Sequence, residues 1–186
     1  MKNKSINKTA GFTLIETLVA IGIFAFSITG LISVTARGVF DTNFVKNKFT
    51  AGYLALEGAE MIRSIRDTAA IQNIPWSTMM GSDQYLRDCV RGDTEACMID
   101  PWTDSISVIS CPQSICPALT YNQGNGRFSY EGQDNSTTFA SIFNRTIYIE
   151  ILNDHEATVT SEVAWNQGTR PHSVVFTYTL LDWAGP

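Results

Sequence analysis

The stretch Thr9-Ala-Gly-Phe-Thr-Leu-Ile-Glu16-Thr-Leu-Val-Ala20 decides how the N-terminal part folds, because it joins a basic tip to a long apolar run. The charged side chains of the tip are all positive: Lys2, Lys4 and Lys8. Residues 17–36 carry no charge, and as a helix they would span roughly 30 Å, the thickness of a bilayer core. A basic tip before such a helix is typical of a membrane topology signal.

Glu16 argues against the simplest alternative, a secretory signal peptide whose basic region is residues 1–8. An acid in a membrane helix costs on the order of 2.5–3.5 kcal/mol at the bilayer centre and less near the end, so a functional role is its default interpretation. If the chain is cut after Gly11, the new amine of Phe12 lies four residues before Glu16. The ammonium and the carboxylate can then neutralise one another, within one helix or between two packed chains.

These residues resemble the class III leader of type IV pilins and pseudopilins. The matching positions are Gly11, Phe12, Thr13, Leu14, Glu16, Leu18 and Val19. The resemblance implies that a prepilin peptidase removes residues 1–11 by cutting after Gly11, and that the same enzyme N-methylates the amine of Phe12. It also implies that Glu16 serves processing and filament assembly.

The resemblance further implies the partners and the location of the chain. The partners would be the prepilin peptidase, other pilin or pseudopilin subunits, and an inner-membrane assembly platform with its ATPase. Before assembly, the chain would be a single-pass membrane protein with residues 12–36 in the membrane and its head outside the cytoplasm. After assembly, it would belong to a cell-surface or periplasmic filament with residues 12–36 in the core.

An amphipathic pattern continues the apolar run, so the sequence predicts one N-terminal helix over residues 12–70. Small and apolar residues recur every three or four positions, at Ala51, Ala55, Gly58, Ile62 and Ile65. The small members of this stripe would let a sheet approach the helix closely.

The limits of this helix follow from its glycines and prolines. We expect it to end between Asp67 and Gln72, before Pro75. We also expect an interruption, because glycine costs about 1 kcal/mol against alanine inside a helix. The candidate positions are Gly22, Gly30 and Gly38.

Residues 73–140 are polar and rich in turn signals, which predicts an irregular region. Short strands are expected over 106–109 and 127–130, and a short helix over 82–90. The region holds all four cysteines, and an even, clustered number in an exported chain indicates two disulfides. The alternative, a metal site, would lack both a Cys-x-x-Cys pair and a nearby histidine. Three connectivities are open, and proximity alone favours the pairs Cys89–Cys97 and Cys111–Cys116.

Residues 143–186 alternate between apolar and polar side chains, which predicts a three-stranded antiparallel sheet. In each strand one set of side chains shares a face: Ile147, Ile149 and Ile151, then Val159, Ser161, Val163 and Trp165, then Val174, Phe176, Tyr178 and Leu180. One face of the sheet can cover the helix stripe. With the helix packed on this meander, the fold class is α+β. This end also resembles minor pilin-like proteins, in Phe143-Asn-Arg-Thr-Ile-Tyr-Ile149, Val163-Ala-Trp165, Gly168, His172-Ser-Val174 and Leu181-Asp-Trp183.

Composition disfavours several other functions. The net charge of −5 is the opposite of what a general nucleic-acid binder shows, so no nucleic acid is expected as a partner. No nucleophile elbow, phosphate-binding loop or zinc-protease motif occurs, and we expect neither an enzyme nor a cofactor nor a metal. The oxygens of Asp100, Asp104, Asp134 and Asn135 lack the spacing of a dedicated calcium loop.

The sequence therefore favours a structural minor pilin or pseudopilin subunit. The same leader serves type II secretion pseudopilins and DNA-uptake filaments, which stand as alternatives. An adhesive binding module at a filament tip is a further one, with Trp102 as a candidate surface residue. A membrane-anchored enzyme would require a catalytic constellation that the sequence does not supply. Asn135 and Asn144 each begin a weak glycosylation sequon.

Overall fold

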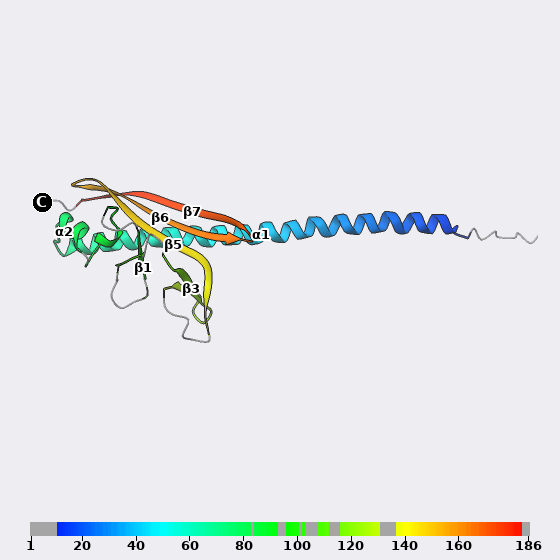
Figure 1. Ribbon diagram of the computed structural model, residues 1–186, viewed down its shortest axis with the longest axis horizontal. Helices are drawn as coiled ribbons and strands as arrows, with labels where there is room; N and C mark the ends of the chain where they lie inside the picture. The colour runs from blue at the N-terminus through cyan, green and yellow to red at the C-terminus, as the bar shows by residue number, and fades with distance from the viewer. Residues whose placement is uncertain are drawn as a thin grey trace, which may run out of the picture. The chain divides into compact units, whose positions relative to one another are not determined.

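The computed structural model describes residues 11–82, 84–92, 96–100, 102, 108–111, 116–130 and 137–183. The chain divides into two compact units, residues 1–45 and residues 46–186, and the second is called the head below. The described part of the first unit consists of a short coil and the N-terminal part of helix α1, which spans Leu14–Ile71 (Figure 1).

Helix α1 is continuous over its 58 residues, so the expected interruption at Gly22, Gly30 or Gly38 is wrong. A single glycine costs about 1 kcal/mol, and the isoleucine, leucine, phenylalanine and alanine residues around each one have better helix propensities than glycine. The end at Ile71 agrees with the predicted range. Asn73 follows with a φ of 56°, and its N–H donates to the Ala70 carbonyl at 3.1 Å, which stops the helix before Pro75.

The head contains a seven-stranded sheet in which all neighbouring strands are antiparallel. Its strands are β1 (Cys97–Ile99), β2 (Val108–Ser110), β3 (Ala118–Asn122), β4 (Arg127–Ser129), β5 (Thr138–Asn153), β6 (Glu156–Gln167) and β7 (Arg170–Leu181). Strand β5 is central, because it pairs with β1, β3 and β6. The last three strands form the predicted meander, with turns at 154–155 and at Gly168, whose φ is +63°.

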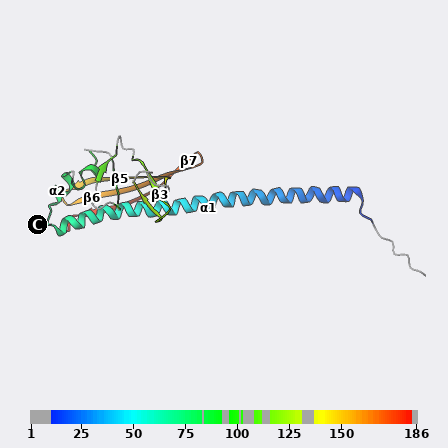
Figure 2. The same cartoon turned by 90° about the horizontal axis from the view of Figure 1, so that it is seen from below.

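The core lies between the C-terminal part of α1 and strands β5–β7, which run alongside each other in both views (Figures 1 and 2). The predicted stripe is confirmed, since Ala51, Ala55, Gly58, Ile62 and Ile65 are all buried. A Cβ atom on Gly58 would lie 2.6 Å from Ser161 Oγ, so the sheet approaches as closely as a glycine permits.

The predicted alternation of the sheet holds with one exception. Val159, Ser161, Val163 and Trp165 are buried, and Tyr178 and Leu180 pair with Val159 and Ala157 on the same face. Ile147 and Ile149 are fully buried, but Ile151 is 46% exposed. Ile151 shares the face of Ile147 and Ile149 but is exposed, because it lies near the end of β5, at a register shift before the turn.

Residues 73–140 contribute more regular structure than expected. They supply β1–β4, which extend the predicted three-stranded meander, and the unpredicted helix α2 (Trp76–Gly81). The helix expected over 82–90 is a single 3₁₀ turn, η1 (Arg87–Cys89). Strand β4 matches one predicted strand, and the other, over 106–109, lies partly outside the described residues and overlaps β2. Strands of three residues are too short to show a period in sequence.

Two disulfides join the neighbouring cysteines, Cys89 to Cys97 and Cys111 to Cys116, which are the pairs that proximity favoured. The first bond lies in the main core and ties η1 to the start of β1. The second lies in a smaller buried cluster with Ala96. Together they anchor the segments with the shortest strands, where few long apolar runs are available.

Candidate functional site

The candidate processing site lies immediately before helix α1. Gly11 and Phe12 are in the coil that precedes Leu14, and the Phe12 side chain is 79% exposed. Thr13 caps the helix: its carbonyl accepts from the N–H groups of Glu16 at 3.1 Å and Thr17 at 3.3 Å, and its Oγ1 lies 3.4 Å from the Glu16 nitrogen. The Gly11–Phe12 peptide bond is therefore outside the helical hydrogen-bond pattern and open to another protein.

Glu16 lies in the first turn of α1 and is exposed. The free N–H groups of a helix N-terminus carry partial positive charge, so a carboxylate there is stabilised within the helix itself. The Thr13 cap and Glu16 thus belong to the same first turn of α1, and this turn begins two residues after Gly11.

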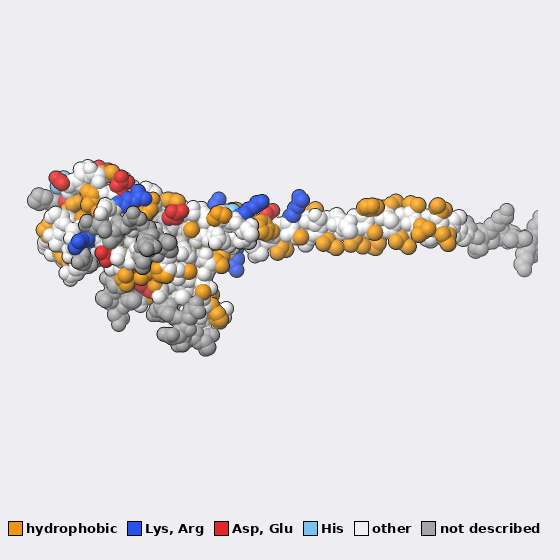
Figure 3. Space-filling model, viewed as in Figure 1, with side chains coloured by type: hydrophobic (Ala, Val, Ile, Leu, Met, Phe, Trp, Pro, Cys, Tyr) orange, Lys and Arg blue, Asp and Glu red, His pale blue; other side chains and the backbone are white. Residues whose placement is uncertain are grey.

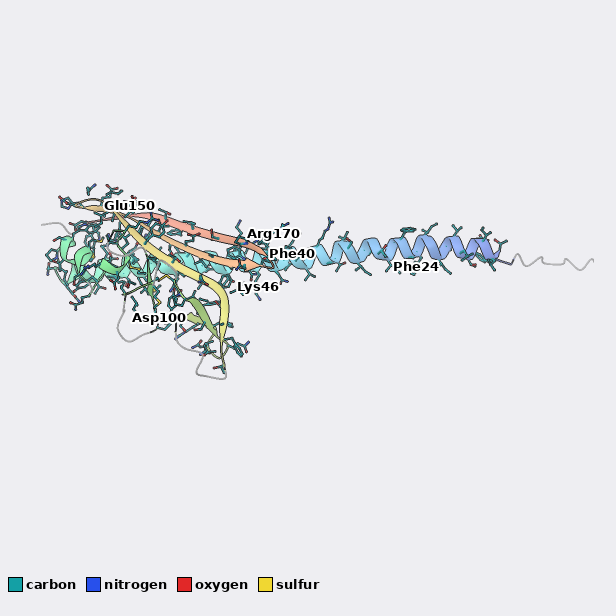
Figure 4. All side chains as sticks on the ribbon, viewed as in Figure 1. Phe24, Phe40, Lys46, Asp100, Glu150 and Arg170 are labelled. Carbon is teal, nitrogen blue, oxygen red and sulfur yellow. A yellow bond between two sulfur atoms is a disulfide. The ribbon has the colours of Figure 1, made fainter. Side chains whose placement is uncertain are left out.

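The N-terminal part of α1 exposes many apolar side chains, and they are seen along its length in Figure 3. Phe24 points outward from the helix (Figure 4). The side chains of Leu14, Ile15, Leu18, Phe26 and Leu31 are exposed as well. The hydroxyl groups of Ser27 and Thr35 donate to carbonyls of the preceding turn, those of Ile23 and Leu31, each at 2.9 Å. Hydroxyls that bond within their own helix are compatible with lipid. In the part of the chain that the structure describes, α1 is the one helix long and apolar enough to cross a membrane.

A comparison with protein families identifies this segment. Residues 6–32 match the model of the prokaryotic N-terminal methylation motif. The chain carries a class III prepilin leader of type IV pilin-like proteins. The matched range includes Gly11, Phe12 and Glu16 and ends inside α1. The pilin-like proteins that carry this motif are structural rather than enzymatic. No curated protein and no solved structure matches the chain.

In the head, Arg145 connects the helix to the sheet. Its side chain is 1% exposed, and Nη1 donates to Glu57 Oε2 at 2.7 Å, while Nη2 donates to the Ile99 carbonyl at 2.7 Å. Nη1 also lies 3.4 Å from the Leu54 carbonyl oxygen. One guanidinium therefore holds α1, β5 and the end of β1 together. The sequence does not single out this residue as a link between helix and sheet, although the alternation of Phe143, Ile147 and Ile149 places position 145 on the same face.

Two half-buried tyrosines make further contacts in this region. The Tyr130 hydroxyl donates to the Arg145 carbonyl at 3.1 Å, and the Tyr178 hydroxyl donates to the Ala59 carbonyl at 3.0 Å. Burial raises the pKa of Tyr130, although Arg145 opposes the shift. Burial also raises the pKa of Tyr178, against the opposing charges of Arg63 and Arg66.

The other candidate residues of the head have local structural roles. The Asp100 carboxylate accepts from the backbone N–H groups of Trp102 at 3.0 Å and Tyr130 at 2.8 Å. Asp104, Asp134 and Asn135, the other calcium candidates, lie outside the described residues. Among the residues that the structure describes, no group of three His, Cys, Asp or Glu side chains is placed to hold a metal ion.

Asn144 and Trp102 have defined partners. The amide of Asn144 donates to the Cys116 carbonyl at 2.8 Å, and the residue pairs with both β3 and β6, so its amide nitrogen is engaged within the folded head. Trp102 is exposed as expected; its Nε1 donates to the Phe128 carbonyl and Arg127 stacks 3.9 Å from its ring centroid.

Proposed function

We propose that this chain is a structural minor pilin or pseudopilin subunit of a type IV pilus-like filament. The observation that carries the proposal is the exposed Gly11–Phe12 bond, which precedes the Thr13 cap and lies inside the N-terminal methylation motif. A prepilin peptidase hydrolyses this bond, releases residues 1–11 and N-methylates the new amine of Phe12.

Glu16 gives the new amine a counter-charge. After cleavage, the Phe12 ammonium lies beside a helix N-terminus, where the helix dipole disfavours positive charge. In the apolar surroundings of packed helices, an unpaired charge costs several kcal/mol. Pairing the ammonium of one chain with Glu16 of its neighbour removes this cost, and it fixes the axial stagger of the two helices.

The apolar part of α1 serves two environments in succession. Before assembly, residues 12–36 hold the chain in the membrane as a single span, with the head outside the cytoplasm. An inner-membrane platform and its ATPase then transfer the subunit into the filament, where the same side chains pack on other pilin or pseudopilin helices. The exposed apolar surface of α1 and its internally bonded hydroxyls support both roles.

Mass spectrometry of the N-terminus tests processing directly. The full chain is produced together with a prepilin peptidase, and we expect a mature protein that begins at methylated Phe12. Gly11→Ala should leave the leader attached, because the resemblance implies that the peptidase recognises glycine, the residue without a side chain, before the cut. Asn7→Ala in the leader is the matched control and should be processed normally. A chain that still begins at Met1, or one cut near Ala36, would contradict the proposal.

A further inference from the structure

The head carries positive charge at the end where α1 enters it. Lys46 and Lys48 belong to α1 at this end, and Arg170 begins β7 there (Figure 4). These three residues are called the basic end. All three are exposed, and no ion pair links any of them to an acid within the described residues.

Apolar side chains of α1 accompany the basic end. Phe49 is 66% exposed and Tyr53 is 72% exposed. They follow Lys46 by three and seven residues, so the three side chains share one face of the helix. The buried residues Ala51 and Ala55 occupy the opposite face, against the sheet.

The opposite end of the head is acidic. Because β5, β6 and β7 pair in antiparallel register, the end of β5, the start of β6 and the end of β7 lie together there. Glu150, Asp154 and Glu156 supply three carboxylates, and they are called the acidic end. Glu150 lies at this end of the sheet, away from Lys46 and Arg170 (Figure 4).

Exposed apolar residues also gather at the acidic end. They are Ile151, Leu152, Leu181 and Trp183, and Trp183 is 62% exposed. The nearby cations already have partners within the head. Arg66 pairs with Asp67 and donates to the Leu181 carbonyl, Arg91 stacks on Tyr148, and His155 lies 3.2 Å from Asp182. Glu150 and Asp154 are exposed, whereas Glu156 is half-buried and accepts from the Asn153 amide at 3.2 Å. Among the described residues, no cation forms an ion pair with any of these three carboxylates.

We infer that the acidic end of one copy docks on the basic end of a copy farther along the filament than the neighbour whose Glu16 pairs with Phe12. Opposite charges steer and orient the two surfaces, and the apolar residues at each end become buried between the copies. The two surfaces differ and lie at opposite ends of one head. The contact is therefore heterologous, and its repetition produces an open chain of subunits rather than a closed dimer. This inference rests on the proposed filament function and assigns its head-to-head contact, separate from the pairing of Phe12 with Glu16.

Zero-length crosslinking with a carbodiimide tests the contact, because this reagent joins a lysine to a carboxylate that already touches it. The full, processed chain in detergent micelles is mixed with a ¹⁵N-labelled copy, so that links between copies are recognised by mass. We expect links from Lys46 or Lys48 to Glu150, Asp154 or Glu156, formed between labelled and unlabelled copies. High salt should reduce their yield, because it screens charges beyond about 3 Å at 1 M.

Charge reversal distinguishes this contact from nonspecific association of the heads. Lys46→Glu with Arg170→Glu should lower the yield of linked dimers about tenfold, equivalent to about 1.4 kcal/mol of association free energy. Asp154→Lys with Glu156→Lys should have the same effect. A mixture of the two variants should restore dimers, because the reversed ends are again complementary. Glu162→Lys, near the centre of β6, is the control with the same type of charge change and should leave the yield unchanged.

Unchanged dimer yield in both reversed variants, or links that do not join the two ends, would overturn the inference. The proposed function has its own separate readout. If the reversed variants still mature at Phe12 and assemble in a Glu16-dependent way, the docking contact is wrong while the filament role stands. A chain that is never cleaved would contradict the filament role, whatever the crosslinks show.

Discussion

Arg145 is the residue on which the junction of helix and sheet depends most. Its guanidinium is buried among Ile147, Tyr130 and α1, and it bonds to Glu57 and to two backbone carbonyls. A buried ion pair adds little net stability over an apolar pair, yet removing one partner leaves an uncompensated charge. Arg145 therefore fixes one arrangement of α1, β1 and β5 and penalises the alternatives.

Glu57→Gln tests this arrangement, because the change keeps the shape and removes the charge. We expect a loss of about 1–3 kcal/mol in the free energy of unfolding, the range for a hydrogen bond to a charged group. Thermal unfolding of the full chain in detergent, followed by circular dichroism, measures the loss. Glu60→Gln is the matched control, because Glu60 pairs with Arg63 on the exposed side of α1. Loss of this exposed ion pair should change the free energy of unfolding by less than about 1 kcal/mol. Equal effects of the two changes would contradict the account.

Tyr178 makes the stability of the head depend on pH at the alkaline end. Burial raises its pKa in the folded state above the ordinary value of 10.0. The folded state therefore favours the neutral hydroxyl, and this contribution is fully present below pH 10. As the pH rises above 10 the unfolded chain loses its phenolic proton first, so the free energy of unfolding falls.

Tyr178→Phe should flatten this alkaline decline, although Tyr130, whose pKa is also raised, keeps part of it. The measurement is the unfolding temperature between pH 8 and pH 12. Tyr53→Phe, a change at an exposed ring on α1, is the control and should leave the alkaline slope as it is. A slope that is the same in Tyr178→Phe as in the original chain would show that the buried hydroxyl is not responsible.

At the scale of elements, the close approach of α1 to β6 depends on Gly58. A Cβ atom there would lie 2.6 Å from Ser161 Oγ and 3.1 Å from both Arg145 Cδ and Ile147 Cδ1. Side chains of the sheet therefore lie directly against the backbone of α1 at Gly58, and they leave no room for a methyl group. The small-residue stripe of α1 is what allows Arg145 to reach Glu57 and the Leu54 carbonyl.

Gly58→Ala should destabilise the head by about 1–3 kcal/mol, the usual cost of overpacking a core. Gly52→Ala is the matched control on the same helix, because nothing lies within 4 Å of its Cβ position, and it should be neutral or stabilising by up to about 1 kcal/mol. Adding Ser161→Ala to Gly58→Ala should recover part of the loss, since it removes the nearest atom. Thermal unfolding of the original chain, Gly58→Ala, Ser161→Ala and the double variant completes the cycle. Additive effects would contradict a direct contact.

At the scale of the whole molecule, the sequence predicts those features of the fold that arise from long segments with a regular apolar pattern. The stripe on α1 and the alternation in β5–β7 each extend over many residues, so the α+β class and the packing of helix on sheet follow from them. The sequence also predicts the leader, because Gly11, Phe12 and Glu16 occupy fixed positions relative to the apolar run that follows. Both disulfide pairs agree with proximity, although spacing alone did not exclude the other connectivities.

The features that sequence missed depend on tertiary contacts. Strands β1 and β2 are three residues long and gain their place by pairing with each other and with β5. Arg145 is an unusual residue on an inner face, and its partner Glu57 lies 88 positions earlier in the chain. The continuity of α1 through its glycines reflects the summed propensity of the flanking residues rather than the local cost at each glycine.

The central claim is that the mature chain enters a filament through its N-terminal helix. The most direct measurement is immunogold electron microscopy of filaments from cells that produce the chain, with an antibody against the head. We predict label on the filaments for the original chain and a strong loss of label for Glu16→Ala, with the variant still present in the membrane. Label that is absent from filaments in the original chain, or undiminished in Glu16→Ala, would contradict the account.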